Sequence, residues 1–277
     1  TKEQNPELNA FITITEEEAL KQAAEADEYI ATPGENPALC GIPFAAKDLF
    51  MTRGILTTAA SKILSNYIPP YDATVIEKLK EQKAVLIGKT NMDQFAHGSS
   101  GETSFYGATK NPWDVSRMPG GSSSGSAAAV AAGLAPWALA TETGGSIRQP
   151  ASLTGVSGWK PTYGRVSRYG AAAMSSSLDS MGAMARSVKD LAMIAEVLSG
   201  KDEKDSTTGP VGVPEYSKQL NASLAGVKVG VPKEYFVDGT EEGVKTRILE
   251  AIEVLRAQGA EIIDVSLPNT KYGSMVY

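Results

Sequence analysis

The sequence predicts an α/β fold, because short apolar runs of strand length alternate with amphipathic segments of helix length. The segment Ala73–Gln82 reads as a helix that leads directly into an apolar strand at Ala84–Gly88. Further along, Val227–Val231, Glu241–Gln258 and Glu261–Val265 read as strand, helix and strand. Together they make a complete βαβ unit, which is the building block of a parallel sheet.

Length and composition limit the class of protein. A chain of 277 residues can bury one large core, so we expect a single domain over residues 1–277. The net charge is −6 and the basic residues are scattered, which argues against direct binding of nucleic acid. Cys40 is the one cysteine, so an internal disulfide or thiolate metal site is excluded. No signal peptide or membrane-spanning run is visible, and we expect a cytoplasmic protein.

The first elements lead to a lysine. Asn9–Thr13 reads as an extended piece, and Thr15–Glu18 is a capping-box pattern that opens a helix running to about Ala31. Ile42–Ala46 is a compact apolar run that places Lys47 at its end. A lysine in this position either extends to solvent or is a desolvated functional amine.

The next signals are caps and a rejected motif. Asp72 is predicted to cap the helix Ala73–Gln82. The letters LIGKT resemble the end of a phosphate-binding loop, but that motif requires glycine where this chain has Lys83, so we expect no nucleotide site there. Ser187–Asp190 is another capping box, and Lys201–Pro214 reads as a surface loop.

The stretch Pro119–Pro150 holds two serine-bearing glycine turns joined by an alanine-rich segment. Ala127–Ala132 favours a helix, and Pro136–Thr141 reads as a strand. The turn Thr143–Ser146 then enters a segment whose first N–H groups lack carbonyl partners, which makes it a candidate oxyanion cradle. A flexible linker is the alternative, but linkers are not flanked by core-forming sequence as this stretch is.

The residue types restrict the chemistry. His97 is the one histidine, so multi-histidine metal sites are excluded and we expect no metal. Gly121–Gly125 matches G-x-S-x-G, but a hydrolase of that type needs a later histidine, and none follows. A thiolate pair of Cys40 with His97 has almost no specificity. Serine activated by a desolvated lysine remains, with a second serine to relay the proton if the amine does not touch the nucleophile.

Four stretches together resemble the amidase signature family: GIPFAAKD, PGGSSSGSAAAVAAG, TETGGSIRQPA and GWKPTYGRVSR. The spacings of 75 and 24 positions between Lys47, Ser122 and Ser146 agree with the Ser-cisSer-Lys triad of that family. Within the family, the stretches PPYDATVIEKLK, IGKTNMDQFAHGSS, TKNPWD and DSTT are most similar to A subunits of glutamyl-tRNA(Gln) amidotransferases. The resemblance implies an α/β/α sandwich around a mixed, mostly parallel sheet.

The resemblance also implies roles for individual residues. Ser146 would be the nucleophile that forms the acyl intermediate, Ser122 the bridging serine after a cis peptide bond, and Lys47 the base. The oxyanion hole would consist of the N–H groups of Thr143, Gly144, Gly145 and Ser146. Residues expected to support this site from behind are Ser123, Glu142, Arg148 and, more weakly, Asp179.

The implied function is that of an amidohydrolase. It would be a glutaminase subunit that releases ammonia from glutamine, so that partner B and C subunits convert Glu-tRNA(Gln) to Gln-tRNA(Gln). This chain would bind no cofactor, while the B subunit would use ATP and Mg²⁺ and hold the tRNA. Two alternatives stay open: a free-standing amidase for small amides, and a non-catalytic assembly module.

The chain departs from the family pattern in two ways. Glu142 stands where aspartate is usual, and less common residues also occupy four other positions: Ser124, Ala140, Trp159 and Ala183. Family members also continue past position 277, so we expect a form that lacks the C-terminal part of the fold. That part would supply the remaining strands and most contacts to the α-carboxylate and amine of the substrate.

Overall fold

Six strands form one mixed sheet in the order β1-β3-β2-β4-β6-β5. The central pairings of β2 with β3 and with β4 are parallel, whereas β1, β6 and β5 join antiparallel. The α/β class and the mixed sheet are therefore confirmed. The expected mostly parallel arrangement is not found in this sheet, because three of its five pairings are antiparallel and the parallel ones are confined to its centre. The strands are β1 Phe11–Ile14, β2 Pro43–Lys47, β3 Val85–Thr90, β4 Trp137–Glu142, β5 Ser157–Trp159 and β6 Ser180–Ala185.

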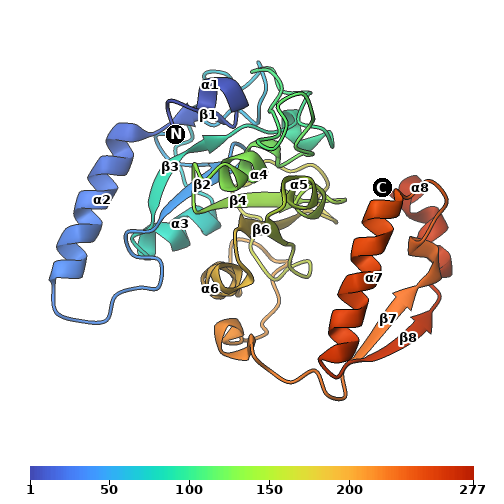
Figure 1. Ribbon diagram of the computed structural model, residues 1–277. Coiled ribbons are helices and arrows are strands. Elements are labelled where there is room, and N and C mark those ends of the chain that lie inside the picture. Colours follow the sequence, from blue (N-terminus) through green and yellow to red (C-terminus); the bar gives the residue numbers. More distant parts are fainter. The chain divides into compact units, whose positions relative to one another are not determined.

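Helices cover both faces of this sheet (Figure 1). Alternate strand residues face opposite sides, so Ala45 packs in the cluster that includes the alanines of α4, while Ala46 packs in the cluster with α3 and α6. This is the sandwich that the family resemblance implied. The helices are α1 Asn5–Leu8, α2 Glu16–Ala31, α3 Thr74–Glu81, α4 Ser124–Ala131, α5 Arg148–Thr154 and α6 Val188–Leu198, with a short 3₁₀ turn at Gln94–Ala96.

The computed structural model describes residues 1–277, except for the side chain of Ser274, and divides them into two compact units. The first unit is Thr1–Ser217 and the second is Lys218–Tyr277. The expected single domain over residues 1–277 stays a prediction.

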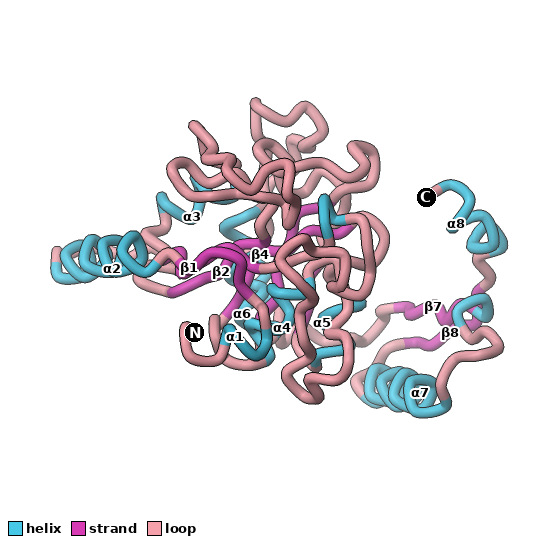
Figure 2. Tube along the Cα trace, turned by 90° about the horizontal axis from the view of Figure 1, so that it is seen from above, coloured by secondary structure: helices cyan, strands magenta, loops and turns pink.

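The second unit contains the predicted βαβ element. Its strands β7 and β8 pair in parallel, and α7 connects them (Figure 2). No helix within the described residues is both long and apolar enough to cross a membrane. The elements of this unit are β7 Lys228–Pro232, α7 Glu242–Ala257, β8 Glu261–Val265, α8 Gly273–Val276 and 3₁₀ turns at Lys233–Tyr235 and Pro268–Tyr272. A further 3₁₀ turn, Tyr216–Gln219, spans the boundary between the two units.

Two of the three predicted caps are wrong. The hydroxyl of Thr15 does not cap α2 but donates to Leu86 O over 2.8 Å. The carboxylate of Asp72 does not cap α3; it accepts from Arg53 N and from Lys80 Nζ, each over 2.8 Å. The third cap is confirmed, because Ser187 Oγ accepts from Asp190 N over 3.1 Å. In the first two cases, a partner outside the local turn has displaced the predicted one.

The predicted surface loop at Lys201–Pro214 is also partly wrong. Asp205 and Thr208 are buried, at 7% and 6% exposure. Asp205 Oδ2 accepts from Arg168 N over 2.8 Å. The loop therefore packs against the rest of the first unit through hydrogen bonds of its acidic residues.

Candidate active site

Lys47 lies at the carboxyl end of β2, between the parallel neighbours β3 and β4. Its side chain is fully buried. The amine Nζ donates to Ser122 Oγ over 2.8 Å, to Ser123 Oγ over 3.0 Å and to Thr141 Oγ1 over 2.9 Å. The lysine predicted as a desolvated amine is therefore enclosed by hydroxyl groups.

Burial changes the protonation of this amine. Desolvation lowers the pKa of Lys47 from 10.5 to about 7, against the opposing influence of the Asp93, Asp179 and Glu142 carboxylates. Near neutral pH, a large fraction of the amine is therefore uncharged. A neutral amine has a lone pair that can accept a proton from a hydroxyl group.

The turn before α4 holds Ser122 firmly. Gly121 and Ser122 are joined by a cis peptide bond, as the resemblance implied. Ser122 O accepts from Asp93 N over 3.1 Å, and Gly121 N donates to Gln149 Oε1 over 2.9 Å. An added Cβ at Gly121 would lie 2.0 Å from Asp93 Oδ2, so only glycine fits. The main chain that carries the Ser122 hydroxyl is therefore held from two sides.

The turn between β4 and α5 presents four free donors. Within the described chain, the N–H groups of Thr143, Gly144, Gly145 and Ser146 have no hydrogen-bond acceptor. Gly145 has φ of 127°, a conformation that favours glycine. Consecutive N–H groups without acceptors are suited to stabilise negative charge on oxygen. The cradle predicted from Thr143–Ser146 is thus available to a ligand.

Glu142 and Arg148 support this turn. The side chain of Glu142 is fully buried, and its Oε2 accepts from Ile147 N over 3.0 Å and from Arg148 N over 2.9 Å. Arg148 Nε donates to Glu142 Oε1 over 2.7 Å. On the other side, Thr143 Oγ1 donates to Asp179 Oδ1 over 2.5 Å. These bonds hold both ends of the four-donor turn.

Ser146 connects the two turns through its main chain. Its carbonyl oxygen accepts from Ser123 N over 3.3 Å, and the residue is 7% exposed. No hydrogen bond joins the hydroxyl groups of Ser146 and Ser122 in the described structure. The structure thus brings Lys47 and Ser122 into direct contact and places Ser146 on the adjoining turn.

Three neighbours of the site were not predicted. The Thr141 hydroxyl accepts from Lys47 Nζ, and the N–H of Asp93 donates to the Ser122 carbonyl oxygen. The side-chain oxygen of Gln149 accepts from Gly121 N in the same turn. Asp93 and Thr141 both lie at or just after the carboxyl end of a strand parallel to β2. The rule that ligand sites gather at such strand ends would have found them.

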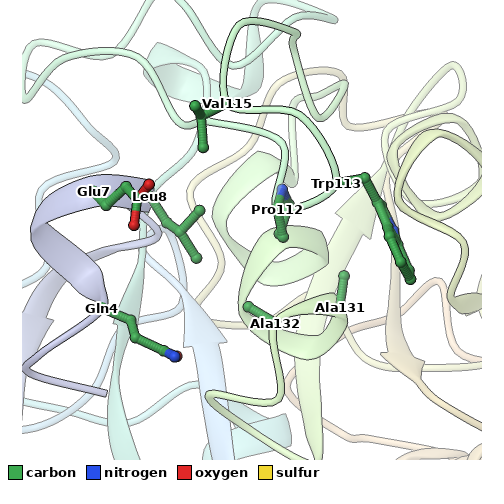
Figure 3. A pocket seen from close by; sticks show the side chains of 8 residues that line it. All are labelled: Gln4, Glu7, Leu8, Pro112, Trp113, Val115, Ala131 and Ala132. Atoms are coloured by element: carbon green, nitrogen blue, oxygen red, sulfur yellow. The ribbon is translucent and has the colours of Figure 1, made fainter.

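A cavity of about 290 Å³ lies elsewhere in the first unit. Figure 3 shows the side chains of Leu8, Trp113 and Val115 around it, together with Ala131 and Ala132 at the far end of α4. The length of that helix, roughly 12 Å, separates these alanines from the serine turn. No predicted site residue lines this cavity.

Comparison with known proteins gives a consistent picture. Residues 1–277 match the family described as Amidase. The A subunit of the glutamyl-tRNA(Gln) amidotransferase from Carboxydothermus hydrogenoformans is 56% identical over 273 residues, which cover 98% of this chain and 56% of that protein. The corresponding protein of Persephonella marina is 50% identical over 277 residues, covering 100% of this chain and 57% of that protein.

The fold is also similar to that of solved structures. The amidotransferase A subunit from Thermotoga maritima superimposes with a TM-score of 0.88 at 44% identity, covering 99% of this chain and 57% of that chain. Peptide amidase from Stenotrophomonas maltophilia gives a TM-score of 0.89 at 38% identity, covering 97% and 56%. The chain therefore spans little more than half the length of these relatives.

Proposed function

The chain belongs to the amidase family, and on that premise we propose that it carries the amide-hydrolysing centre of a glutamine-dependent amidotransferase. One observation carries this proposal. A fully buried lysine with a pKa of about 7 donates to Ser122 Oγ over 2.8 Å. The adjoining turn offers four unengaged N–H groups.

In the proposed reaction, Ser146 Oγ attacks the amide carbonyl carbon. Its proton passes to Ser122 Oγ while the Ser122 proton passes to the neutral amine of Lys47. The oxyanion of the tetrahedral intermediate accepts from the N–H groups of residues 143–146. Lys47 then returns its proton through Ser122 to the leaving nitrogen, the C–N bond breaks and ammonia departs. Water hydrolyses the remaining acyl ester by the same route in reverse.

Ser122 has a defined part in this scheme. Lys47 Nζ reaches Ser122, Ser123 and Thr141, and no hydrogen bond to Ser146 is found among the described residues. A relay is therefore needed between the nucleophile and the base. Ser122 is the hydroxyl that lies closest to the amine, at 2.8 Å.

Glutamine is the proposed substrate because the relatives at 50% identity and above include several glutamyl-tRNA(Gln) amidotransferase A subunits. In such an assembly, we expect B and C subunits to be partners, with ATP, Mg²⁺ and the tRNA on the B subunit, in the cytoplasm. A free-standing amidase for small amides is the second candidate. The likeness to peptide amidase, with a TM-score of 0.89, favours it.

Labelling tests the proposed centre. The chain is treated with a fluorophosphonate, digested, and the adduct located by mass spectrometry, with Ser146→Ala as the control. We expect the adduct on Ser146. An adduct on Ser122, Ser123 or Cys40 would overturn the assignment, and no adduct would favour an assembly module. Comparing kcat/KM for glutamine and for small peptide amides then separates the two candidate enzymes.

A further inference from the structure

A second lysine is buried behind the proposed centre. Lys89 of β3 is paired in register with Ala46, on the sheet face opposite to Lys47, and its side chain has no exposed surface. Its Nζ donates to Phe50 O over 2.8 Å and to Thr57 Oγ1 over 2.6 Å. It also lies 3.5 Å from Oδ1 of Asp48, whose side chain is likewise fully buried. The proposed mechanism uses neither residue of this pair.

Asp48 holds the segment from Thr58 to Ala60. Its Oδ2 accepts from Thr58 N over 2.9 Å and also from Thr58 Oγ1. Its carbonyl oxygen accepts from Ala59 N over 2.9 Å. Ala59 and Ala60 have φ of 47° and 54°, in the left-handed region that residues with a Cβ disfavour. Surrounding contacts must therefore enforce this conformation, and Asp48 supplies several of them.

The same segment supports the turn that carries Ser122. Phe95 N donates to Ala59 O over 2.9 Å, and Phe105 N donates to Ala60 O over 3.0 Å. The chain between these two amides forms a loop that folds back on Asp93, whose carboxylate accepts from Gly101 N over 3.0 Å. Asp93 N in turn donates to Ser122 O over 3.1 Å.

We propose that Asp48, paired with Lys89, is a positioning residue that sets the contact between Lys47 Nζ and Ser122 Oγ. It acts on the lysine through the chain, because Asp48 follows Lys47 directly and its N–H donates to Thr90 O over 3.1 Å. It acts on the serine through Thr58, Ala59 and the Asp93 loop. For its kinetic readout, this inference rests on the proposed function.

The charges of the pair explain why both members are needed. Burial raises the pKa of Asp48 and lowers the pKa of Lys89 to about 8, so each group depends on the other to remain charged. Removing one partner leaves an uncompensated buried charge, whereas removing both charges together is much better tolerated. Asparagine at position 48 would still offer a carbonyl oxygen to Thr58.

The test compares Asp48→Asn, Lys89→Met and the variant that carries both changes. Two rates are measured on the 277-residue chain: acylation of Ser146 by p-nitrophenyl acetate, followed as release of p-nitrophenolate, and acetylation of Lys47 by acetic anhydride. We expect each single change to slow acylation by about ten- to hundredfold at unchanged reagent affinity, because small misplacements of reacting groups have effects of this size. Lys47, which is fully buried in the unmodified chain, should become accessible and be acetylated in each single variant. The double variant should recover most of both properties.

A matched control replaces another lysine–carboxylate pair. Lys204 Nζ lies 2.6 Å from Glu77 Oε2, but both side chains are partly exposed and neither contacts the serine turns. Lys204→Met with Glu77→Gln should leave acylation unchanged. If the single Asp48 and Lys89 variants do not fold, Thr58→Val gives the same readouts, because it removes the hydroxyl that donates to Asp48 Oδ2 and accepts from Ala60 N over 3.1 Å.

The outcomes separate this inference from the proposed function. Failure of the unmodified chain to label at Ser146 refutes the proposed function, and protection of Lys47 from acetylation still decides the inference. Single variants that acylate at the normal rate and keep Lys47 protected would overturn it. A double variant as impaired as the worse single variant would also overturn it, since the pair would then have no joint role.

Discussion

Lys47 Nζ donates to Ser122 Oγ over 2.8 Å, although the two residues are 75 positions apart. The strand β2 ends at Lys47, and the turn before α4 lies next to this carboxyl end of the strand. Because both side chains are fully buried, bulk water does not compete for this hydrogen bond. The contact therefore makes sharp predictions about the lysine.

Replacing Lys47 with arginine should strongly slow acylation of Ser146. A guanidinium stays protonated at every accessible pH, so it cannot accept the proton that the scheme requires. We expect a loss of about 10²- to 10⁴-fold, the usual contribution of a general base. Lys80→Arg is the control, because the Lys80 side chain is 43% exposed. A Lys47→Arg chain that labels at the normal rate would refute the assigned base.

The acylation rate should rise with pH and level off above about 7, where the amine of Lys47 is neutral. The rate of acylation by p-nitrophenyl acetate, measured between pH 5 and pH 9, tests this, and Lys47→Met should show no such rise. A profile that is flat or falling over this range would contradict the role of a neutral amine.

The stability of the fold should also rise as pH rises, but over a higher pH range than the acylation rate. The folded chain lowers the pKa of Lys47 from 10.5 to about 7, so the unfolded chain binds more protons between these values and stability rises with pH across that window. Lys47→Met should therefore stabilise the fold at pH 6 by a few kcal/mol more than at pH 9.5. Urea unfolding at both pH values measures the difference. Equal effects would mean that Lys47 is not desolvated.

The parts of the site predicted from the sequence have local signals. An apolar run ends at Lys47, and Gly144 and Gly145 form the middle of the turn of residues 143–146, so composition and spacing identify both. The parts that were missed depend on contacts between distant segments. Asp93 N donates to Ser122 O although the two residues are 29 positions apart, and the Thr15 hydroxyl donates to Leu86 O instead of capping its own helix. Local patterns cannot rank such competing partners.

Aspartate is usual in the family at position 142, but shortening Glu142 to aspartate should still impair this chain. Its Oε2 accepts from Ile147 N and Arg148 N, whereas its Oε1 accepts from the Arg148 side chain. Glu142→Gln should keep one acceptor but weaken the bonds to Arg148, which lowers stability by about 1 to 3 kcal/mol. Thermal unfolding measures this effect.

Glu142→Asp should affect the acylation rate of Ser146 more than the stability of the fold, because the shorter side chain shifts the four-donor turn.

Gly121→Ala should disable the centre through sterics alone. The new Cβ would lie 2.0 Å from Asp93 Oδ2, 3.0 Å from Gly101 N and 3.1 Å from Ser100 N. Asp93 cannot simply withdraw, because its carboxylate accepts from Gly101 N over 3.0 Å. The Ser122 turn must therefore move away from Lys47.

We expect this substitution to slow acylation of Ser146 by about ten- to hundredfold. Gly212→Ala is the matched control, since a Cβ there meets nothing within 4 Å. Circular dichroism checks that the variant is folded, and acetylation of Lys47 reports whether the amine has lost its enclosure. If Gly121→Ala acylates at the normal rate with Lys47 still protected, the turn has moved without separating Lys47 from Ser122. The tight contact between Gly121 and Asp93 would then have no part in holding the relay serine.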